Sequence, residues 1–160
     1  MSKDEFLMRY GGIYEHSPWV AERAWHALAD DAGTEAIAAA MATAVDEADQ
    51  SEQLALISAH PQLAAKRAEP LTESSRSEQA SAGLDSLSAD DFELFEALNS
   101  TYLDRFGFPF VIAVRGRSAQ EILGIFRQRV ASDPGTEFQT AIAEIHKIAR
   151  LRLDTMEASS

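Results

Sequence analysis

The apolar residues of this chain recur mainly at the three- and four-residue spacing of an amphipathic helix. Two stretches show the pattern most clearly. Their apolar stripes consist of Phe92, Phe95, Leu98 and Tyr102 in the first, and of Ile142, Ile145, Ala149 and Leu153 in the second. Each stripe predicts a helix that buries one face against the rest of the protein.

The remaining helices are predicted from composition and from residues that start or stop them. The chain is rich in Ala, Leu, Glu and Gln, which favour helices, and it has no Asn-Gly or Asp-Gly hairpin turn. We expect helices over residues 3–10, 19–28, 34–48, 51–59, 75–84, 89–106, 119–131 and from 134 onward. The prediction is therefore an all-α protein: a single domain over residues 1–160, folded as a bundle of about seven to nine helices.

Polar residues mark several of the predicted helix starts. Ser17, followed by a proline, and Ser88 are typical N-caps, and Ser118 forms a capping box with Glu121. Gly107 is expected to end the helix that Ser88 begins.

One segment, near residues 108–114, does not fit a helix. It is apolar and β-branched but too short for one, so we expect it to be extended. Its backbone groups need partners, since a helical protein offers no sheet to supply them. A flat heterocyclic ligand is one candidate partner for Phe108, Phe110, Val111 and Ile112. The alternative is that the aromatic side chains are core and the backbone pairs with a neighbouring loop.

Charge and composition limit the classes of function. The 160 residues carry a formal net charge of −12, which an anionic duplex or membrane surface would repel. Cysteine is absent and the four histidines are scattered, so neither a disulfide framework nor a metal site is predicted. We see no signal peptide, membrane span or peroxisomal tripeptide, and we expect a cytoplasmic protein that binds neither nucleic acid nor membrane.

The first candidate for chemistry is His60-Pro61. His60 continues the apolar face of Leu56 and Ile57, and Pro61 ends the helix there. A histidine so placed is a natural proton carrier near neutral pH. The alternative interpretation is a histidine that only hydrogen-bonds the last carbonyls of its helix.

The second candidate is the segment from Ser75 to Gln79. Ser75 and Glu78 match the capping-box pattern, which is a purely structural interpretation. Alternatively, the helix start presents Ser75, Glu78 and Gln79 to a polar ligand, and the Gln79 amide reads a urea or amide group.

The third candidate is the pair Arg150 and Arg152 in the last helix. Successive helical residues point about 100° apart, so the two side chains lie on different faces. One of them could grip a carboxylate with two hydrogen bonds, while a solvated helix face explains either arginine equally well. These residues alone do not name a substrate.

Taken together, five segments resemble the OHCU decarboxylase family of ureide metabolism. The matching segments, in the family's order, are GGIYEHSPWVAERAW at 11–25, His-Pro-x-Leu at 60–63, LTxxSxxEQxxAGL at 71–84, FGFPFVIAVRG at 106–116 and KIARLRL at 147–153. They extend over nearly the whole chain. Gln62 departs from the family, which more often has an acidic residue there.

The resemblance implies a cofactor-free carboxy-lyase, most often a homodimer, that forms (S)-allantoin from 2-oxo-4-hydroxy-4-carboxy-5-ureidoimidazoline (OHCU). It implies that His60 is the acid/base and that Glu78 and Arg152 orient the substrate, with Arg150 as the alternative to Arg152. It further implies a substrate pocket formed by Pro61, Ser75, Gln79, Phe108, Phe110, Val111 and Ile112. A binding module for a ureide or purine-like ligand, without turnover, remains the alternative function, and a purely structural interaction domain is a weaker one.

Overall fold

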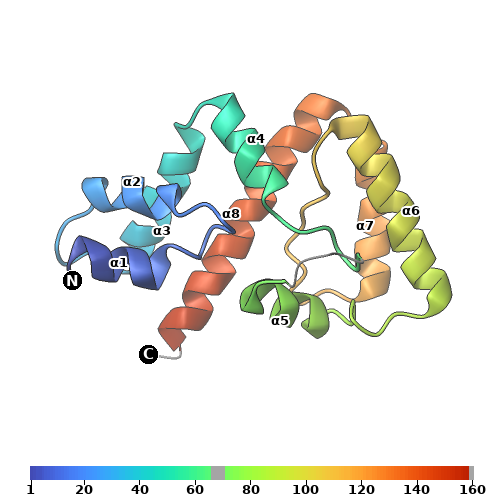
Figure 1. The fold of residues 1–160 in the computed structure, drawn as a ribbon, viewed down its shortest axis with the longest axis horizontal. Coiled ribbons are helices and arrows are strands. Elements are labelled where there is room, and N and C mark those ends of the chain that lie inside the picture. Colours follow the sequence, from blue (N-terminus) through green and yellow to red (C-terminus); the bar gives the residue numbers. More distant parts are fainter. Residues whose placement is uncertain (66–70, 159–160) are drawn as a thin grey trace. The chain divides into compact units, whose positions relative to one another are not determined.

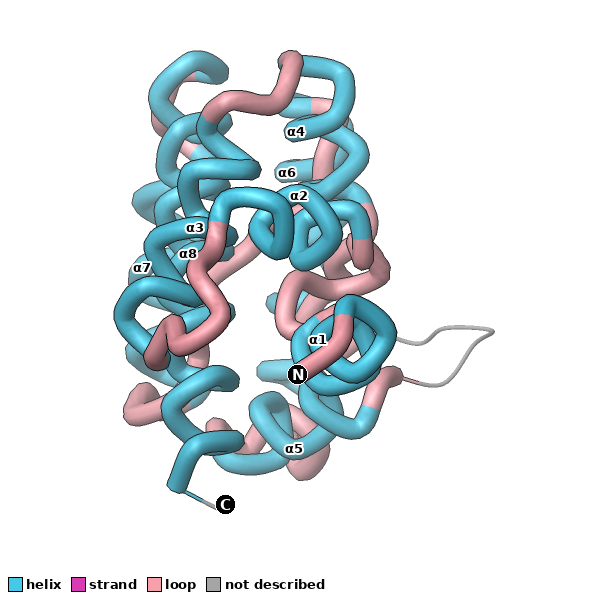
Figure 2. Tube along the Cα trace, turned by 90° about the vertical axis from the view of Figure 1, so that its left-hand side faces the viewer, coloured by secondary structure: helices cyan, strands magenta, loops and turns pink. Residues whose placement is uncertain are grey.

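The described part of the chain is built from helices joined by loops (Figure 2). A computed structural model describes residues 1–65 and 71–158. The helices in those ranges are α1 (Lys3–Tyr10), α2 (Trp19–Ala27), α3 (Thr34–Asp46), α4 (Gln50–Ser58), α5 (Glu73–Ser81), α6 (Ala89–Phe106), α7 (Ala119–Val130) and α8 (Pro134–Ala158). The described residues contain no strand, which confirms the predicted all-α class, and these eight helices fall within the predicted number.

Several predicted helix ends are confirmed in detail. The side chain of Ser118 accepts a hydrogen bond from the Glu121 N–H at 3.2 Å, and the Glu121 carboxylate accepts one in return. The Ser88 side chain caps α6 by accepting a hydrogen bond from the Asp91 N–H at 3.2 Å. Gly107 ends α6 with φ +78°, a left-handed conformation that glycine adopts without strain.

Two predicted caps are wrong. Pro18, not Ser17, is the N-cap position of α2, and the Ser17 hydroxyl instead donates to the Glu15 carbonyl. Helix α5 begins two residues before Ser75, because Thr72 caps it by accepting a hydrogen bond from the Ser75 N–H at 3.2 Å. Thr72 offers the same hydroxyl as Ser75 one turn earlier, so the helix gains another turn by starting there.

The described residues cluster into two compact units. The first consists of Met1–His60 with Ile145–Ser160, and the second is the continuous segment Pro61–Glu144. Helix α8 therefore contributes its beginning to the second unit and its later turns to the first. The prediction of one domain over residues 1–160 stays a prediction.

The first unit contains α1 to α4 and the later turns of α8 (Figure 1). Helix α2 packs against both α1 and α3. The Phe6 ring of α1 lies 4.8 Å from the Tyr10 ring and 5.3 Å from the Trp25 ring, measured between centroids. These contacts accompany the burial of Phe6 and Tyr10 on the inner face of α1.

The second unit has an aromatic core beneath α6 and α7, which pack against each other. The rings of Phe110 and Phe126 are stacked, with centroids 3.8 Å apart and planes only 9° apart. Tyr102 meets the Phe110 ring at 5.5 Å in an edge-on arrangement. The core thus seats an aromatic side chain of the non-helical segment between two helices.

The two apolar stripes behave differently. All four predicted positions of α8 are buried. In α6, Phe95 and Tyr102 are buried, whereas Phe92 and Leu98 are only half-buried and Asn99 is buried in addition. A polar residue therefore lies where spacing alone predicts an apolar face.

The segment between α6 and α7 is non-helical and buried, as predicted. Phe108 through Val114 are each less than a tenth exposed. Among the described residues, no helix is long and apolar enough to cross a membrane.

Candidate active site

His60 lies just beyond the C-terminal end of α4, and its side chain is buried. Its Nδ1 lies 2.9 Å from the Leu56 carbonyl oxygen. A carbonyl only accepts, so Nδ1 carries a proton and donates it. Nε2 is therefore the nitrogen that exchanges a proton when the ring acts as acid or base. The two interpretations of His60 are compatible, because the helix-end hydrogen bond fixes the tautomer that acid/base chemistry needs.

Three predicted site residues share one face of α5. Ser75, Glu78 and Gln79 are spaced three and four residues apart, which aligns them along a helix. Ser75 and Gln79 are buried, and Glu78 is half-buried. The polar face of α5 is thus turned inward, which a cap alone does not require.

The Gln79 amide holds the loop at the start of the second unit. Its Oε1 accepts a hydrogen bond from the Ala64 N–H at 3.0 Å, and its Nε2 donates to the Gln62 carbonyl at 3.5 Å. The Asn99 side chain donates to the Leu63 carbonyl at 2.9 Å. Two buried amides therefore hold the backbone of residues 62–64, so Gln79 has a structural role in addition to any contact with substrate.

The non-helical segment finds backbone partners in charged side chains. The Val111 carbonyl accepts a hydrogen bond from Arg129 Nη1 at 2.6 Å. The Ala113 N–H donates to Glu144 Oε1 at 3.3 Å. Of the two interpretations, core aromatics are confirmed by the burial of Phe108 and Phe110. The two partners named here are side chains of α7 and α8, whereas a neighbouring loop was expected.

Arg129 is the centre of a buried polar cluster in the second unit. Its Nε lies 2.9 Å from Glu137 Oε1, which also accepts a hydrogen bond from the Tyr102 hydroxyl at 2.6 Å. The guanidinium carbon lies 4.5 Å from the centre of the Phe110 ring. Burial, and next the hydrogen bond to Glu137, raise the pKa of Tyr102, so its hydroxyl stays protonated and donates. The cluster fixes the position of Val111.

The two arginines of α8 have very different surroundings. Arg152 is buried, with Nη2 2.8 Å from Glu15 Oε2 and Nη1 donating to the Ile13 carbonyl at 3.3 Å. Arg150 is 40% exposed and pairs with Glu35 and, at 2.9 Å, with Asp154. Arg152 is therefore a buried, ion-paired arginine, whereas Arg150 matches the interpretation as a solvated helix face.

The predicted site residues divide between the two units. His60 and Arg152 belong to the first, and Glu78 belongs to the second. The remaining predicted residues, which are Pro61, Ser75, Gln79, Phe108, Phe110, Val111 and Ile112, all belong to the second as well. Within that unit, the structure ties Gln79 to the loop after Pro61.

Glu15 and Arg129 were missed by sequence reasoning. Glu15 lies inside the GGIYEHSP segment, where a single acid directly after Ile13 and Tyr14 was a usable signal. Arg129 follows Ile122 and Phe126 at helical spacing, so its place on the buried stripe of α7 was also visible. Neither signal names a partner.

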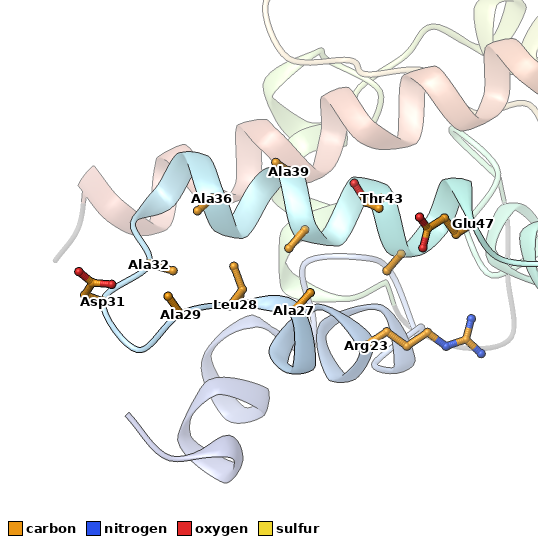
Figure 3. Close-up of a pocket in the computed structure, with 12 residues that line it drawn as sticks. Arg23, Ala27, Leu28, Ala29, Asp31, Ala32, Ala36, Ala39, Thr43 and Glu47 are labelled. Carbon is orange, nitrogen blue, oxygen red and sulfur yellow. The ribbon is translucent and has the colours of Figure 1, made fainter.

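The hollow in Figure 3 is separate from all predicted site residues. It has a volume of about 770 Å³ and lies between α3 and the end of α2, both in the first unit. Alanine side chains line most of it, including Ala36 and Ala39, and Arg23 and Glu47 lie at one end (Figure 3). Few of the side chains that line it are polar, so it has few groups that could bind or react with a ligand.

The described residues thus form a helical protein in which the buried His60 has a fixed tautomer and α5 turns Ser75, Glu78 and Gln79 inward. A sequence model described as OHCU decarboxylase matches residues 1–154. The chain belongs to the OHCU decarboxylase family.

Curated relatives agree over almost the whole chain. The 2-oxo-4-hydroxy-4-carboxy-5-ureidoimidazoline decarboxylase of Haloferax volcanii is 46% identical, over 96% of this chain and 89% of the relative. The mouse protein of the same name is 34% identical, over 96% of this chain and 86% of the mouse protein. A uric acid degradation bifunctional protein of Bacillus subtilis is 43% identical over 89% of this chain, which corresponds to 28% of that longer protein.

Solved structures share the fold. A crystal structure of (S)-allantoin synthase matches with a TM-score of 0.79 and 33% identity, over 98% of this chain and 51% of that one. A crystal structure of OHCU decarboxylase in the presence of (S)-allantoin matches with a TM-score of 0.73, over 97% of this chain and 98% of that one. At 23% identity, the second likeness supports the fold alone.

Proposed function

We propose that this protein is an OHCU decarboxylase, a carboxy-lyase that releases carbon dioxide from OHCU and forms (S)-allantoin in urate degradation. The family match over residues 1–154 carries the proposal. The relative at 46% identity supports it, because its name states this reaction and the match covers most of both chains.

The reaction needs no cofactor on chemical grounds. When the carbon–carbon bond to the carboxylate breaks, carbon dioxide departs and the electron pair stays with the ring, where adjacent unsaturated groups delocalise it. A proton must then be added on one face only, and this addition sets the configuration of allantoin. The protein's contribution is to orient the carboxylate and to manage that proton.

We propose that His60 is the acid/base that handles the proton added to the ring. Its Nδ1 is committed to the Leu56 carbonyl at 2.9 Å, so Nε2 is the atom proposed to exchange the proton. Burial supports the assignment, since it limits competing protonation by water.

We assign orienting roles to Glu78 and Arg152. Glu78 is half-buried on the inward face of α5, where a carboxylate can accept a hydrogen bond from the substrate hydroxyl. Arg152 is buried with its guanidinium direction set by Glu15 and Ile13, which suits recognition of the substrate carboxylate. Backbone groups of Phe108 to Ile112 are proposed to bind the ring edges.

The first experiment generates OHCU in place from urate with urate oxidase and hydroxyisourate hydrolase. Circular dichroism then follows (S)-allantoin as it forms. We expect a rapid signal from one enantiomer with the wild-type protein, and loss of it in His60→Asn. His26→Asn is the matched control, because His26 is an exposed histidine of α2. Racemic allantoin formed at the rate without protein would refute the decarboxylase.

A binding module without turnover is the alternative function. It predicts that the protein binds allantoin or a related ureide, that OHCU decays at its spontaneous rate, and that His60→Asn leaves affinity unchanged. The same experiment, combined with calorimetric titration of allantoin, separates the two.

Assembly and location complete the proposal. We propose a homodimer that works in the cytoplasm on a small-molecule substrate. Light scattering of the purified chain measures the first, and fractionation of the source cells the second.

A further inference from the structure

Glu15 is a buried carboxylate in the loop that follows α1. Only 2% of it is exposed, and neither the family assignment nor the proposed acid/base chemistry accounts for it. A charged group is seldom buried so deeply unless another charge or several hydrogen bonds stabilise it.

The charged side chain that lies nearest to Glu15 is that of Arg152, while the His16 ring is farther away, with Nε2 3.8 Å from Oε1. Glu15 Oε2 lies 2.8 Å from Arg152 Nη2, and the Ile13 carbonyl accepts a hydrogen bond from Nη1 at 3.3 Å. Both terminal nitrogens of the guanidinium are thus held by residues of one loop. Because the guanidinium is planar, two fixed nitrogens fix the direction of the whole fork.

The loop itself is anchored to α8 at a second point. The Tyr14 hydroxyl lies 2.8 Å from His146 Nδ1, and His146 Nε2 lies 3.0 Å from Asp46 Oδ1. Burial, and next the charge of Asp46, raise the pKa of Tyr14, so its hydroxyl remains a donor to Nδ1. Three consecutive residues of the loop, Ile13, Tyr14 and Glu15, therefore each contact a side chain of α8.

We propose that Glu15 is a positioning residue for Arg152 that sets the direction of the guanidinium and offsets its charge. This inference rests on the proposed decarboxylase function. An arginine without a counter-charge would bind the substrate carboxylate tightly and stabilise the anion that the reaction must discharge. An arginine already paired to Glu15 orients the substrate carboxylate without strongly stabilising its charge. The negative charge can therefore pass into the ring as carbon dioxide leaves.

This role has a kinetic signature that a structural role lacks. Glu15→Gln keeps the size and one acceptor but removes the charge. We expect kcat to fall at least tenfold and KM to fall or stay unchanged, because the arginine then binds the ground state better than the transition state. An unchanged kcat, or a KM that rises, would overturn the proposal.

Glu35→Gln is the matched control. Glu35 pairs with Arg150, two residues from Arg152 on the same helix, but this pair is exposed. We expect both kinetic constants to change by less than twofold. A loss of kcat equal to that of Glu15→Gln would show a general effect of charge on α8 and would contradict the proposal.

A double variant tests whether Glu15 acts through Arg152. Arg152→Lys keeps a positive charge but loses the planar fork. In that background we expect Glu15→Gln to change kcat by less than twofold, because the direction it sets no longer exists. If Glu15→Gln lowers kcat tenfold both in the wild type and in Arg152→Lys, Glu15 does not act through Arg152 and the proposal is overturned.

Folding is checked by far-ultraviolet circular dichroism before each assay. If Glu15→Gln does not fold, Glu15→Asp is tested in its place. Aspartate keeps the negative charge, but its side chain is one methylene shorter, so the carboxylate lies farther from Arg152. A kcat at least threefold lower without a higher KM then supports the role, and any other result overturns it. The wild-type assay separates the two claims: no stereoselective acceleration refutes the decarboxylase, whereas full activity in Glu15→Gln refutes only the positioning role.

Discussion

At the scale of single residues, one side chain can serve both the structure and the proposed chemistry. His60 satisfies the Leu56 carbonyl at the end of α4, and the same hydrogen bond decides which nitrogen is basic. Gln79 likewise holds a loop while it lies on the inward face of α5. A structural hydrogen bond at such a position is therefore no argument against a functional role.

Glu78 provides a residue-scale prediction with a control on the same helix. Glu78→Gln should lower kcat at least tenfold, because a neutral amide cannot accept a proton and is a weaker acceptor for the substrate hydroxyl than a carboxylate. Glu73→Gln, in the exposed first turn of α5, should leave kcat within twofold. Steady-state assays of both variants check this, and equal activities would remove Glu78 from the mechanism.

Asp133 provides a prediction on pH. Hydrogen bonds from the Thr136 hydroxyl and N–H lower the pKa of Asp133 below its usual 3.8. A carboxyl whose folded-state pKa is lowered stabilises the fold above its unfolded pKa, and this contribution is lost as the pH falls through the folded value. Asp133→Asn should therefore lower Tm at pH 6 and have a shrinking effect below pH 3.8. Thermal unfolding from pH 2 to 6 measures this, and a constant difference in Tm would contradict it.

At the scale of elements, α7 and the non-helical segment depend on each other through Arg129. The arginine satisfies the Val111 carbonyl and pairs with Glu137, and its guanidinium stacks on Phe110. Without it, the segment proposed to bind the substrate ring would lose its main polar anchor. Arg129 thus positions the segment whose backbone groups are proposed to bind a ligand.

Arg129→Met should lower the free energy of unfolding by about 3–5 kcal/mol, because it leaves the Glu137 carboxylate buried without its counter-charge. Arg127→Met, at an exposed position of the same helix, should change it by less than about 0.5 kcal/mol. Urea denaturation of both variants measures the difference. Similar values for the two would mean that the ion pair contributes little.

The helices were predictable because each carries its own signal in local spacing and caps. Ser118 and Gly107 act on neighbours within four residues, so a single sequence suffices to place them. The cap at Thr72 was missed because two hydroxyl residues compete within one turn. Local sequence does not decide between them.

The site partners were not predictable, because they join distant parts of the chain. Glu15 and Arg152 are 137 positions apart, and no local pattern relates them. Family resemblance identified Arg152, and only the fold shows what holds it. The roles of His60, Glu78 and Arg152 remain predictions for the experiments above.

At the scale of the whole molecule, the net charge of −12 opposes the approach of an anionic substrate. Added salt screens that repulsion, with a Debye length that falls to roughly 8 Å at physiological ionic strength. We therefore expect kcat/KM to rise about twofold between low and physiological salt, while kcat stays unchanged. Assays over a series of NaCl concentrations test this, and a falling kcat/KM would indicate that local positive charge outweighs the overall field.

The division of the chain into units has a consequence for its synthesis. The first unit needs residues from both ends of the chain, whereas Pro61–Glu144 is continuous. On the ribosome, the segment Met1–His60 emerges first but must wait for the late turns of α8, so the unit that starts the chain finishes folding last. Until then the Ile13 carbonyl and the Glu15 carboxylate lack Arg152, and the nascent N-terminal helices are exposed to chaperones and proteases for longer than the segment translated after them.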